Sequence, residues 1–543
     1  MHSTSDQYPR IILSTLNARY IHAALGLRYL LANLDVHGGT GLQARSTIRE
    51  YTIVRSPDEI VADLLATLGP PVPGRTQVIG FGVYIWNVTQ TTAVLGLLRA
   101  ARANLKIVLG GPEVSHETNE QAIMAWADHV ITGWGDVSFA KLCRALIDGP
   151  RPLMKVIAGE QPALAEIALP YAHYSDADLA NRVLYVEASR GCPFKCEFCL
   201  SALDKTAWAF ELETVLQALA TLYSRGARQF KFVDRTFNLK IDSSVRILQF
   251  FLDRLGQADQ GGAGQPDLAL HFEVIPDHLP ERLRTMLAQF PAGVLQLEIG
   301  IQSFNQEVQQ TISRRQDNAA SEANLRWLLA HTGAHLHVDL IFGLPGESLA
   351  SFAQGFDRLR AIGPHEIQLG VLKRLRGTPI ARHTLTHGMV YSAGPPYTVQ
   401  QTAQLDANTV LQFTRLVRYW DLVANSGRFG HSLTLLLTLP KRASAFCNFW
   451  DFSLALWLRC NRTQRLSPEE LVDALFDYLC QQGIDTRTVR DALLADYIAS
   501  GARSQPATLR AYLPRYNALP TTSAHGQFSR QSQHQKRPGL PQP

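Results

Sequence analysis

Short apolar runs alternate with amphipathic stretches over the first 150 residues. The runs have the length and β-branched content of strands, and the stretches between them repeat apolar residues at helical spacing. This alternation predicts a parallel sheet with helices on both faces, a doubly wound, flavodoxin-like α/β domain over residues 1–150. The expected strands are 11–15, 50–54, 78–84, 106–110 and 129–132, and the expected helices are 25–34, 58–68, 91–103, 118–126 and 138–147.

A second alternating series follows a proline-containing stretch. Residues 151–180 show little periodicity and are expected to form a surface linker. Residues 181–395 repeat strand and helix six times, which suits a partial (β/α)6 barrel. The expected strands are 183–188, 229–233, 269–274, 294–301, 335–342 and 366–372, and the expected helices are 212–225, 243–255, 280–289, 319–331 and 348–362.

Helical patterns replace strand patterns after Pro395 and Pro396, so residues 396–519 are expected to form an α-helical domain. A capping box with proline at the first helical position, residues 467–470, supports this reading. The Gly- and Gln-rich residues 257–265 are expected to form a mobile loop. Residues 520–543 contain almost no apolar side chains and are expected to be disordered.

Composition narrows the class of protein. The 543 residues are 46% hydrophobic and 18% charged, which excludes a mostly disordered chain and a membrane protein. The net charge of +5 is spread along the chain, so nucleic acid is not an expected partner. The sequence shows no basic and apolar leader and no apolar run of spanning length, so a cytoplasmic location without a membrane partner is expected.

Three of the seven cysteines, Cys192, Cys196 and Cys199, fall in a C-x3-C-x2-C pattern directly after the first strand of the second series. Three thiolates can hold a cubane iron–sulfur cluster and leave one iron open, and an open iron can chelate a small molecule and pass it an electron. A zinc knuckle with a distant fourth ligand and three incidental core cysteines are the alternatives. Neither Cys nor His follows within the span of a compact knuckle, because the next His is His271.

This segment resembles the radical SAM superfamily, whose members cleave S-adenosylmethionine (SAM). Phe198 matches the aromatic residue near the adenine, residues 232–238 resemble the segment that contacts the SAM amino group, and residues 298–303 with 314–315 resemble the stretch near the ribose and carboxylate. Residues 339–347 resemble the motif that supports the adenine. The resemblance implies a 4Fe–4S cluster on the three cysteines and SAM contacts from Phe198, Asp234, Thr236, Glu298, Gln302, Arg315 and Asp339. Ordinary polar ends of barrel strands are the alternative for Asp234, Glu298 and Arg315.

A doubly wound domain ahead of such a barrel resembles the cobalamin-binding subclass of this superfamily. Glycine pairs in loops after strands let backbone approach a corrin closely, although a glycine-rich loop also simply turns a chain. The histidine-ligated pattern D-x-H-x-x-G is incomplete around His37, so no histidine below the cobalt is expected. The resemblance implies cobalamin contacts from Asn17, Tyr20, Tyr84, Trp86, Gly110, Gly111, Glu113, Gly133 and Gly135.

The resemblance implies an enzyme that cleaves SAM reductively to a 5′-deoxyadenosyl radical and uses cobalamin to transfer a methyl group to an unactivated carbon of a small-molecule substrate. Its electrons are expected from a donor such as flavodoxin or ferredoxin. Cobalamin-assisted cyclisation or rearrangement is one alternative, and a non-catalytic iron–sulfur or cobalamin sensor, which would not need the SAM motifs, is another. The C-terminal region resembles an uncharacterised helical extension. His431, Cys447, Cys460 and Cys480 lie there at irregular spacings and are expected to be packed core residues, with a substrate pocket or an extra cluster as the alternative.

Overall fold

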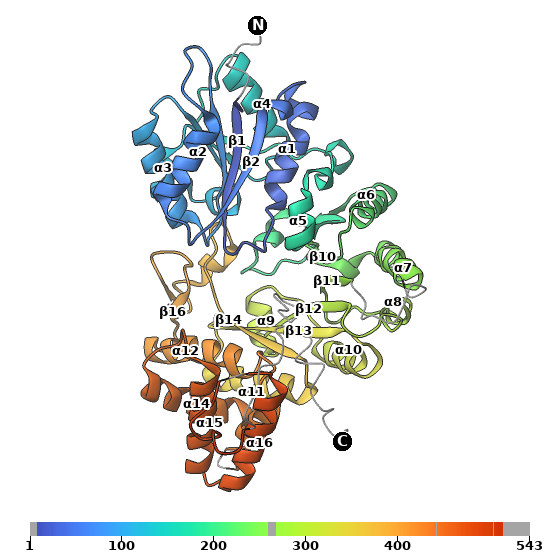
Figure 1. Ribbon diagram of the computed structural model, residues 1–543, viewed down its shortest axis with the longest axis vertical. Coiled ribbons are helices and arrows are strands. Elements are labelled where there is room, and N and C mark those ends of the chain that lie inside the picture. Colours follow the sequence, from blue (N-terminus) through green and yellow to red (C-terminus); the bar gives the residue numbers. More distant parts are fainter. Residues whose placement is uncertain (1–7, 259–267, 441, 503, 514–543) are drawn as a thin grey trace.

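The structure is a computed structural model that describes residues 8–258, 268–440, 442–502 and 504–513. An α/β domain, a strand-and-helix barrel and a helical unit follow one another from the top to the bottom of Figure 1. Most of the expected loop at 257–265 and all of the expected tail at 520–543 lie outside the described residues.

The first domain is built on a six-stranded parallel sheet in the order β2-β1-β3-β4-β5-β6. The predicted doubly wound fold is confirmed, with the second strand starting four residues earlier than expected. The sixth strand lies within residues 151–180, which were expected to form a surface linker. That expectation was wrong for the first part of this stretch, because Val156–Ala158 pairs with β5. The strands are β1 (Ile11–Asn17), β2 (Ser46–Thr52), β3 (Val78–Gly82), β4 (Lys106–Gly110), β5 (His129–Thr132) and β6 (Val156–Ala158).

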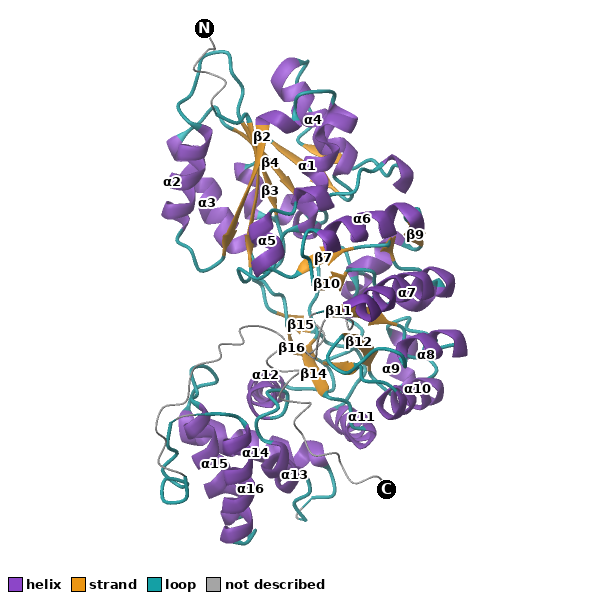
Figure 2. Cartoon of the chain, turned by 45° about the vertical axis from the view of Figure 1, so that its right-hand side comes forward, coloured by secondary structure: helices purple, strands orange, loops and turns teal. Residues whose placement is uncertain are grey.

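Alternation along the strands creates two cores, one on each face of this sheet. Ile12 and Leu16 of β1 join the core under one pair of helices, whereas Ile11 and Leu13 join the core under the other pair. Figure 2 shows the helices on both sides of the sheet. The first pair is α2 (Pro57–Leu68) and α3 (Val88–Ala101), and the second is α1 (Leu25–Gly38) and α4 (Asp136–Asp148).

The helix expected at 118–126 does not form. Two 3₁₀ turns, Thr118–Glu120 and Ala122–Trp126, flank Gln121, whose backbone is extended with φ −102° and ψ 122°. The buried amide of Gln121 donates hydrogen bonds to the carbonyls of Glu113 and His116. These bonds hold the preceding loop and interrupt the helical path.

The remainder of the expected linker is packed against both domains rather than laid over the surface. It carries the short helix α5 (Asp176–Asn181), which Ser175 caps. The Tyr171 hydroxyl donates to the carbonyl of Glu187 at 3.0 Å, and the Tyr174 hydroxyl donates to the carbonyl of Tyr185 at 2.7 Å. Both tyrosines are buried, so this stretch fills the seam at the start of the barrel.

The barrel is an open sheet of six parallel strands in the order β14-β13-β12-β11-β10-β7, as predicted. The strands are β7 (Leu184–Val186), β10 (Gln229–Phe232), β11 (Ala269–Val274), β12 (Leu295–Gln302), β13 (His335–Phe342) and β14 (Glu366–Val371). The helices are α6 (Leu212–Ser224), α7 (Ile241–Ala258), α8 (Glu281–Leu287), α9 (Gln306–Thr311), α10 (Asn318–His331) and α11 (Leu349–Ile362).

The two faces of the barrel strands differ in polarity. On β12, Leu297 and Ile299 belong to the hydrophobic core, while Glu298 between them lines a cavity. On β13, Leu340 likewise enters the core and Asp339 lines the same cavity. Because successive side chains of a strand point to opposite faces, the same alternation that packs the core also directs polar groups into the barrel.

The C-terminal helices extend the core of the barrel. Phe413 stacks on Phe342 of β13 with ring centroids 3.8 Å apart, and the Trp420 indole donates to the carbonyl of Ile367 on β14 at 2.8 Å. A small hairpin, β15 (Val390–Tyr391) and β16 (Val399–Gln401), precedes the helices. The helices are α12 (Ala407–Val423), α13 (Gly430–Leu437), α14 (Ala445–Cys460), α15 (Pro468–Gln481) and α16 (Thr486–Ala499).

Within the described ranges, every helix is too short or too polar to cross a membrane.

A buried ion-pair network docks the first domain onto the end of the barrel. Glu113 and Glu117, in the loop after β4, face Arg374 and Arg376, in the segment after β14. Glu113 also accepts a hydrogen bond from the Tyr397 hydroxyl at 2.6 Å. The side chains of Arg376 and Glu113 are 13% and 3% exposed, so this contact is shielded from water.

We expect Arg376→Ala to destabilise the protein by about 3 kcal/mol, because it leaves the carboxylate of Glu113 buried without its cation. Urea unfolding measures the loss. The matched control is Arg459→Ala, which breaks an exposed ion pair with Asp477 and is expected to cost less than about 1 kcal/mol. Equal effects of the two substitutions would contradict the buried docking contact.

Candidate active site

The three clustered cysteines lie in the turn between two short antiparallel strands, β8 (Ser189–Gly191) and β9 (Ala207–Ala209), directly after β7. We call residues 192–199 the cluster loop. Gly191 has φ +84°, and a Cβ there would lie 2.2 Å from the carbonyl oxygen of Thr206, so glycine is required at the entry to this loop.

The cluster loop opens into a cavity of about 260 Å³ at the mouth of the barrel. All three cysteines line this cavity together with most of the predicted SAM contacts. The predicted residues that line it are Cys192, Cys196, Cys199, Phe198, Thr236, Glu298, Gln302, Arg315 and Asp339.

The cysteine environment fits a group that binds thiolates. Burial raises the pKa of the Cys192 thiol to about 11, and burial also raises the pKa of Cys196. A guanidinium nitrogen of Arg314 lies 3.4 Å from the sulfur of Cys196 and partly offsets that rise. In the described residues, no three His, Cys, Asp or Glu side chains converge as a single metal ion requires. Three cysteines that line one cavity are a donor set that suits a 4Fe–4S cluster with one open iron.

Two polar atoms in the cavity wall make no hydrogen bond within the described residues. Gln302 Oε1 and Asp339 Oδ1 are buried without a hydrogen bond from the described residues, and His337 Nε2 lies 3.5 Å from the latter. Gln302 sits at a register shift in β12 and has φ +69°, an uncommon backbone conformation for a residue with a side chain. Unpaired buried oxygens and local strain are typical of a site that a polar ligand completes.

Two carboxylates on neighbouring strands have opposite electrostatic environments. Burial would raise the pKa of Glu298, but a 2.8 Å hydrogen bond with His271 and the nearby Lys231 lower this pKa below its ordinary value. Burial and the neighbouring carboxylates Glu298 and Glu273 raise the pKa of Asp339. The cavity therefore presents one ionised carboxylate and one that favours its protonated form until a cationic group arrives.

Asp234 does not line this cavity. Its buried carboxylate accepts hydrogen bonds from the Ala188 amide at 3.0 Å and from the Ser189 hydroxyl at 2.6 Å. Burial raises its pKa to about 7. Asp234 thus fixes the chain that leads into the cluster loop, and its direct contact with SAM stays a prediction.

The predicted SAM contacts did not include four further charged residues of this cavity, although two of them lie in the segments that resemble SAM motifs; the four are Arg235, Glu273, Asp277 and Arg314. Arg235 and Glu273 form an ion pair at 2.8 Å. On β11, Glu273 lies between Phe272 and Val274, which both belong to the hydrophobic core. Because successive side chains of a strand point to opposite faces, this alternation could have placed Glu273 on the cavity side of the strand.

A second cavity, of about 290 Å³, lies in the first domain at the carboxyl ends of the strands. A Cβ at Gly80 would lie 2.7 Å from the Phe139 ring, and Gly111, with φ +108°, would place a Cβ 2.5 Å from the carbonyl oxygen of Val83. Side chains at these two positions would collide with neighbouring protein atoms. A Cβ at Gly133 would meet nothing within 4 Å, so glycine there leaves open space in the wall. The predicted cobalamin contacts that line this cavity are Tyr84, Gly110, Gly111, Gly133 and Gly135.

The other four predicted cobalamin contacts lie outside this cavity. The Asn17 amide is buried and donates to the His22 carbonyl and to Glu50. Tyr20 is 56% exposed and lies under Arg182, and Trp86 is 47% exposed and stacks on Tyr84 at 4.4 Å. Glu113, the fourth, belongs to the ion-pair network with Arg376.

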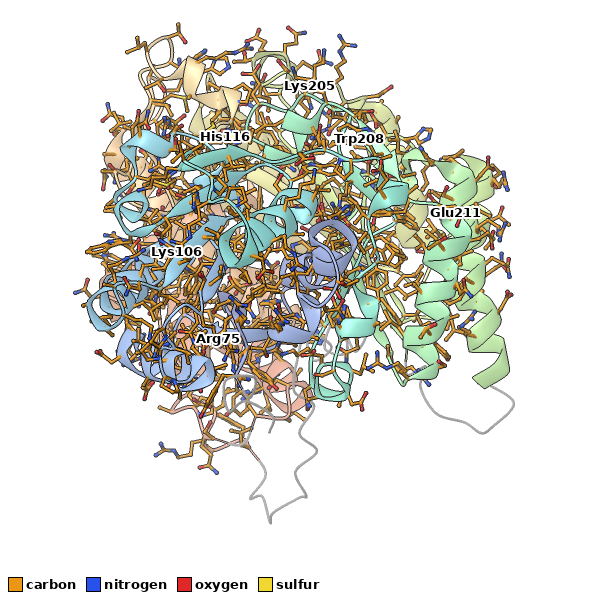
Figure 3. All side chains as sticks on the ribbon, turned by 90° about the horizontal axis from the view of Figure 1, so that it is seen from above. Arg75, Lys106, His116, Lys205, Trp208 and Glu211 are labelled. Carbon is orange, nitrogen blue, oxygen red and sulfur yellow. The ribbon has the colours of Figure 1, made fainter. Side chains whose placement is uncertain are left out.

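Arg190 links the first-domain cavity to the strand that leads into the cluster loop. It lines the first-domain cavity although it belongs to β8, two residues before Cys192. Its guanidinium bonds Asp136 at 2.9 Å and Glu187 at 2.8 Å, and it lies 5.0 Å from the centre of the Trp134 ring. Trp208, labelled in Figure 3, pairs with Arg190 across the β8–β9 hairpin and meets Trp134 edge to face.

Residues 186–359 match the family described as the Radical SAM superfamily, and residues 385–537 match a family described as a protein of unknown function (DUF4080). The chain is 31% identical to an uncharacterized methyltransferase of Pyrococcus horikoshii over 206 residues, which are 31% of this chain and 44% of the relative. It is 24% identical to the cobalamin-dependent radical SAM methyltransferase TokK of Streptomyces tokunonensis over 328 residues, which are 54% of this chain and 47% of TokK.

Two solved structures share the fold. The cobalamin-dependent SAM radical enzyme OxsB, with aqua-cobalamin and SAM bound, has a TM-score of 0.59 at 13% identity and covers 93% of this chain and 83% of its own. The radical SAM methyltransferase TsrM of Kitasatospora setae has a TM-score of 0.54 at 16% identity, with 72% of this chain and 79% of its own covered.

The chain therefore contains a radical SAM domain, as the resemblance of the cysteine segment and the SAM motifs predicted. Its fold is that of cobalamin-dependent radical SAM enzymes, so the predicted resemblance is confirmed. The chain matches about half the length of the curated relatives.

Anaerobic reconstitution with iron and sulfide should load a 4Fe–4S cluster that disappears when Cys192, Cys196 and Cys199 are all replaced by Ala. The control replaces the half-buried Cys447, Cys460 and Cys480 by Ala and should retain the cluster. Iron content per chain and visible absorbance measure both outcomes. Zinc bound in place of iron, or a cluster that survives the first triple substitution, would refute the assignment.

Glu347, in the turn after β13, should make stability fall as pH rises. Burial raises its native pKa from 4.5 to about 7, so between these pH values the folded state holds a proton that the unfolded state has lost. Relative to Glu347→Gln, the parent should lose roughly 1 kcal/mol of unfolding free energy per pH unit in this window. Urea titrations at pH 5, 6 and 7 test this, with the exposed capping residue variant Glu470→Gln as a control that shows no such trend.

Proposed function

We propose that this protein is a cobalamin-dependent radical SAM enzyme that transfers a methyl group to an unactivated carbon of a small-molecule substrate. The observation that carries this proposal is the presence of two cavities, one lined by the cysteines and the SAM motifs and the other by strand-end glycines. Arg190, two residues before Cys192, lines the second cavity and pairs with Asp136 of the first domain. Group transfer between two bound cofactors and a substrate requires such closeness.

The cluster loop and the barrel residues would hold the 4Fe–4S cluster and SAM. Cys192, Cys196 and Cys199 would ligate a 4Fe–4S cluster, which when bound supplies one electron for cleavage of SAM to a 5′-deoxyadenosyl radical. Gln302 Oε1 and Asp339 Oδ1, which make no hydrogen bond within the described residues, would accept hydrogen bonds from SAM. The chain's own part is to orient SAM and to keep its reacting bond away from bulk water.

The first domain would hold cobalamin, which when bound supplies a methyl group. Gly110, Gly111, Gly133 and Gly135 bring backbone close to the cavity, and Tyr84 closes one side. The names of the relatives support methyl transfer, since two of them are called methyltransferases. The expected lack of a histidine below the cobalt stays a prediction.

Electrons would come from an external donor such as flavodoxin or ferredoxin, because each reductive cleavage of SAM consumes one electron. We place the protein in the cytoplasm, where free cysteines persist in the reduced state.

The products of SAM consumption test this proposal. A cobalamin-dependent methyltransferase uses SAM twice, so turnover under anaerobic reduction should yield S-adenosylhomocysteine and 5′-deoxyadenosine together. Mass spectrometry of the reaction with and without cobalamin measures both. Formation of 5′-deoxyadenosine alone would favour cyclisation or rearrangement, and a loaded protein that never cleaves SAM would favour the sensor.

A further inference from the structure

Glu197, which lies between the second and third clustered cysteines, is an unusual residue for its position because its carboxylate points away from the cavity and into protein. Its side chain is only 3% exposed. It accepts hydrogen bonds from the Ser313 hydroxyl at 2.5 Å, from His383 Nε2 at 2.8 Å and from the Arg382 guanidinium. One cluster-loop carboxylate thus binds two distant parts of the chain.

The backbone of Glu197 repeats both connections. Its amide donates to the carbonyl of Ile312 at 3.1 Å, and its carbonyl accepts from the Ile380 amide at 3.0 Å. The partly buried ring of the next residue, Phe198, packs against a hydrophobic group that includes Ile380 and Val399. Side chain, backbone and ring therefore hold this side of the cluster loop at the same place.

The segment that receives these contacts is itself firmly held. Residues 374–383, which we call the connecting segment, begin with the arginines that bind Glu113 and Glu117 of the first domain. A Cβ at Gly377 would lie 2.3 Å from the His116 ring, so the segment closely approaches the first domain there. The connecting segment leads directly into the region that matches the family of unknown function.

From this geometry we infer that Glu197 is a positioning residue, which fixes the cluster loop to the connecting segment and thereby sets where the cluster lies relative to the first domain. Buried charged hydrogen bonds are stronger and more directional than neutral ones, which suits this task. Residues that orient metal ligands without touching the metal commonly tune its binding and electronic properties. The inference rests on the proposed cluster at the three cysteines.

The test compares Glu197→Gln with the parent, both reconstituted anaerobically as full chains. Gln keeps the shape but supplies an NH2 group where the carboxylate had accepted only, so one of its bonds must fail. We expect iron content to stay at the parent level, the electron paramagnetic resonance signal of the reduced cluster to change its g-values, and iron to be lost to a chelator about tenfold faster.

Two further variants separate positioning from general destabilisation. Asp496→Asn removes a buried carboxylate with three hydrogen bonds in the helical unit and should leave signal and iron release unchanged. The side chain of Arg382 is 61% exposed, so its removal is not expected to prevent folding. Arg382→Ala should speed iron release, because it removes one partner of Glu197. Arg382→Lys keeps the positive charge and should restore the parent rate.

Parent-like spectra and iron release in both Glu197→Gln and Arg382→Ala would overturn the inference. So would an equal change in Asp496→Asn. Failure of the parent chain itself to take up iron would instead refute the proposed function, so the two failures are distinguishable.

Discussion

The structure around the first-domain cavity and the cluster loop depends on the ion pairs of Arg190 with Asp136 and Glu187. The Arg190 guanidinium forms ion pairs with Asp136 of the first domain and with Glu187 of the barrel, whose side chains are nearly buried. Burial raises the pKa of Glu187 even beside this cation, so loss of Arg190 would leave costly charge in the seam. Because Arg190 lies two residues before Cys192 and also lines the glycine-walled cavity, the same contact orients the cluster loop and closes the first-domain site.

Most of the fold could be predicted from periodicity, since both sheets consist of strands and helices with clear apolar faces. The misses occur where tertiary contacts decide. Strand β6 consists of only three apolar residues, Val156–Ala158, which is too short a run to show a strand pattern, and pairing with β5 makes it a strand. Around Gln121, side-chain bonds to the preceding loop override a helical pattern.

The candidate site could be predicted where a motif fixes both residue type and strand end. Cys192, Glu298 and Asp339 line one cavity because they follow or alternate within barrel strands. Glu113 and Glu197 show the limit of such reasoning. Each lies inside a recognisable loop, but its carboxylate binds residues more than 180 positions away in the chain, and nothing in the local sequence reveals those partners.

Amide hydrogen exchange of the reconstituted protein with and without aquacobalamin tests the central claim, that the first-domain cavity and the cluster loop meet at Arg190. The account predicts that cobalamin slows exchange at residues 110–111 and 133–136 and also across the junction at Ser189–Gly191. Protection confined to other surfaces, or protection of the first domain with unchanged exchange at Ser189–Gly191, would contradict it.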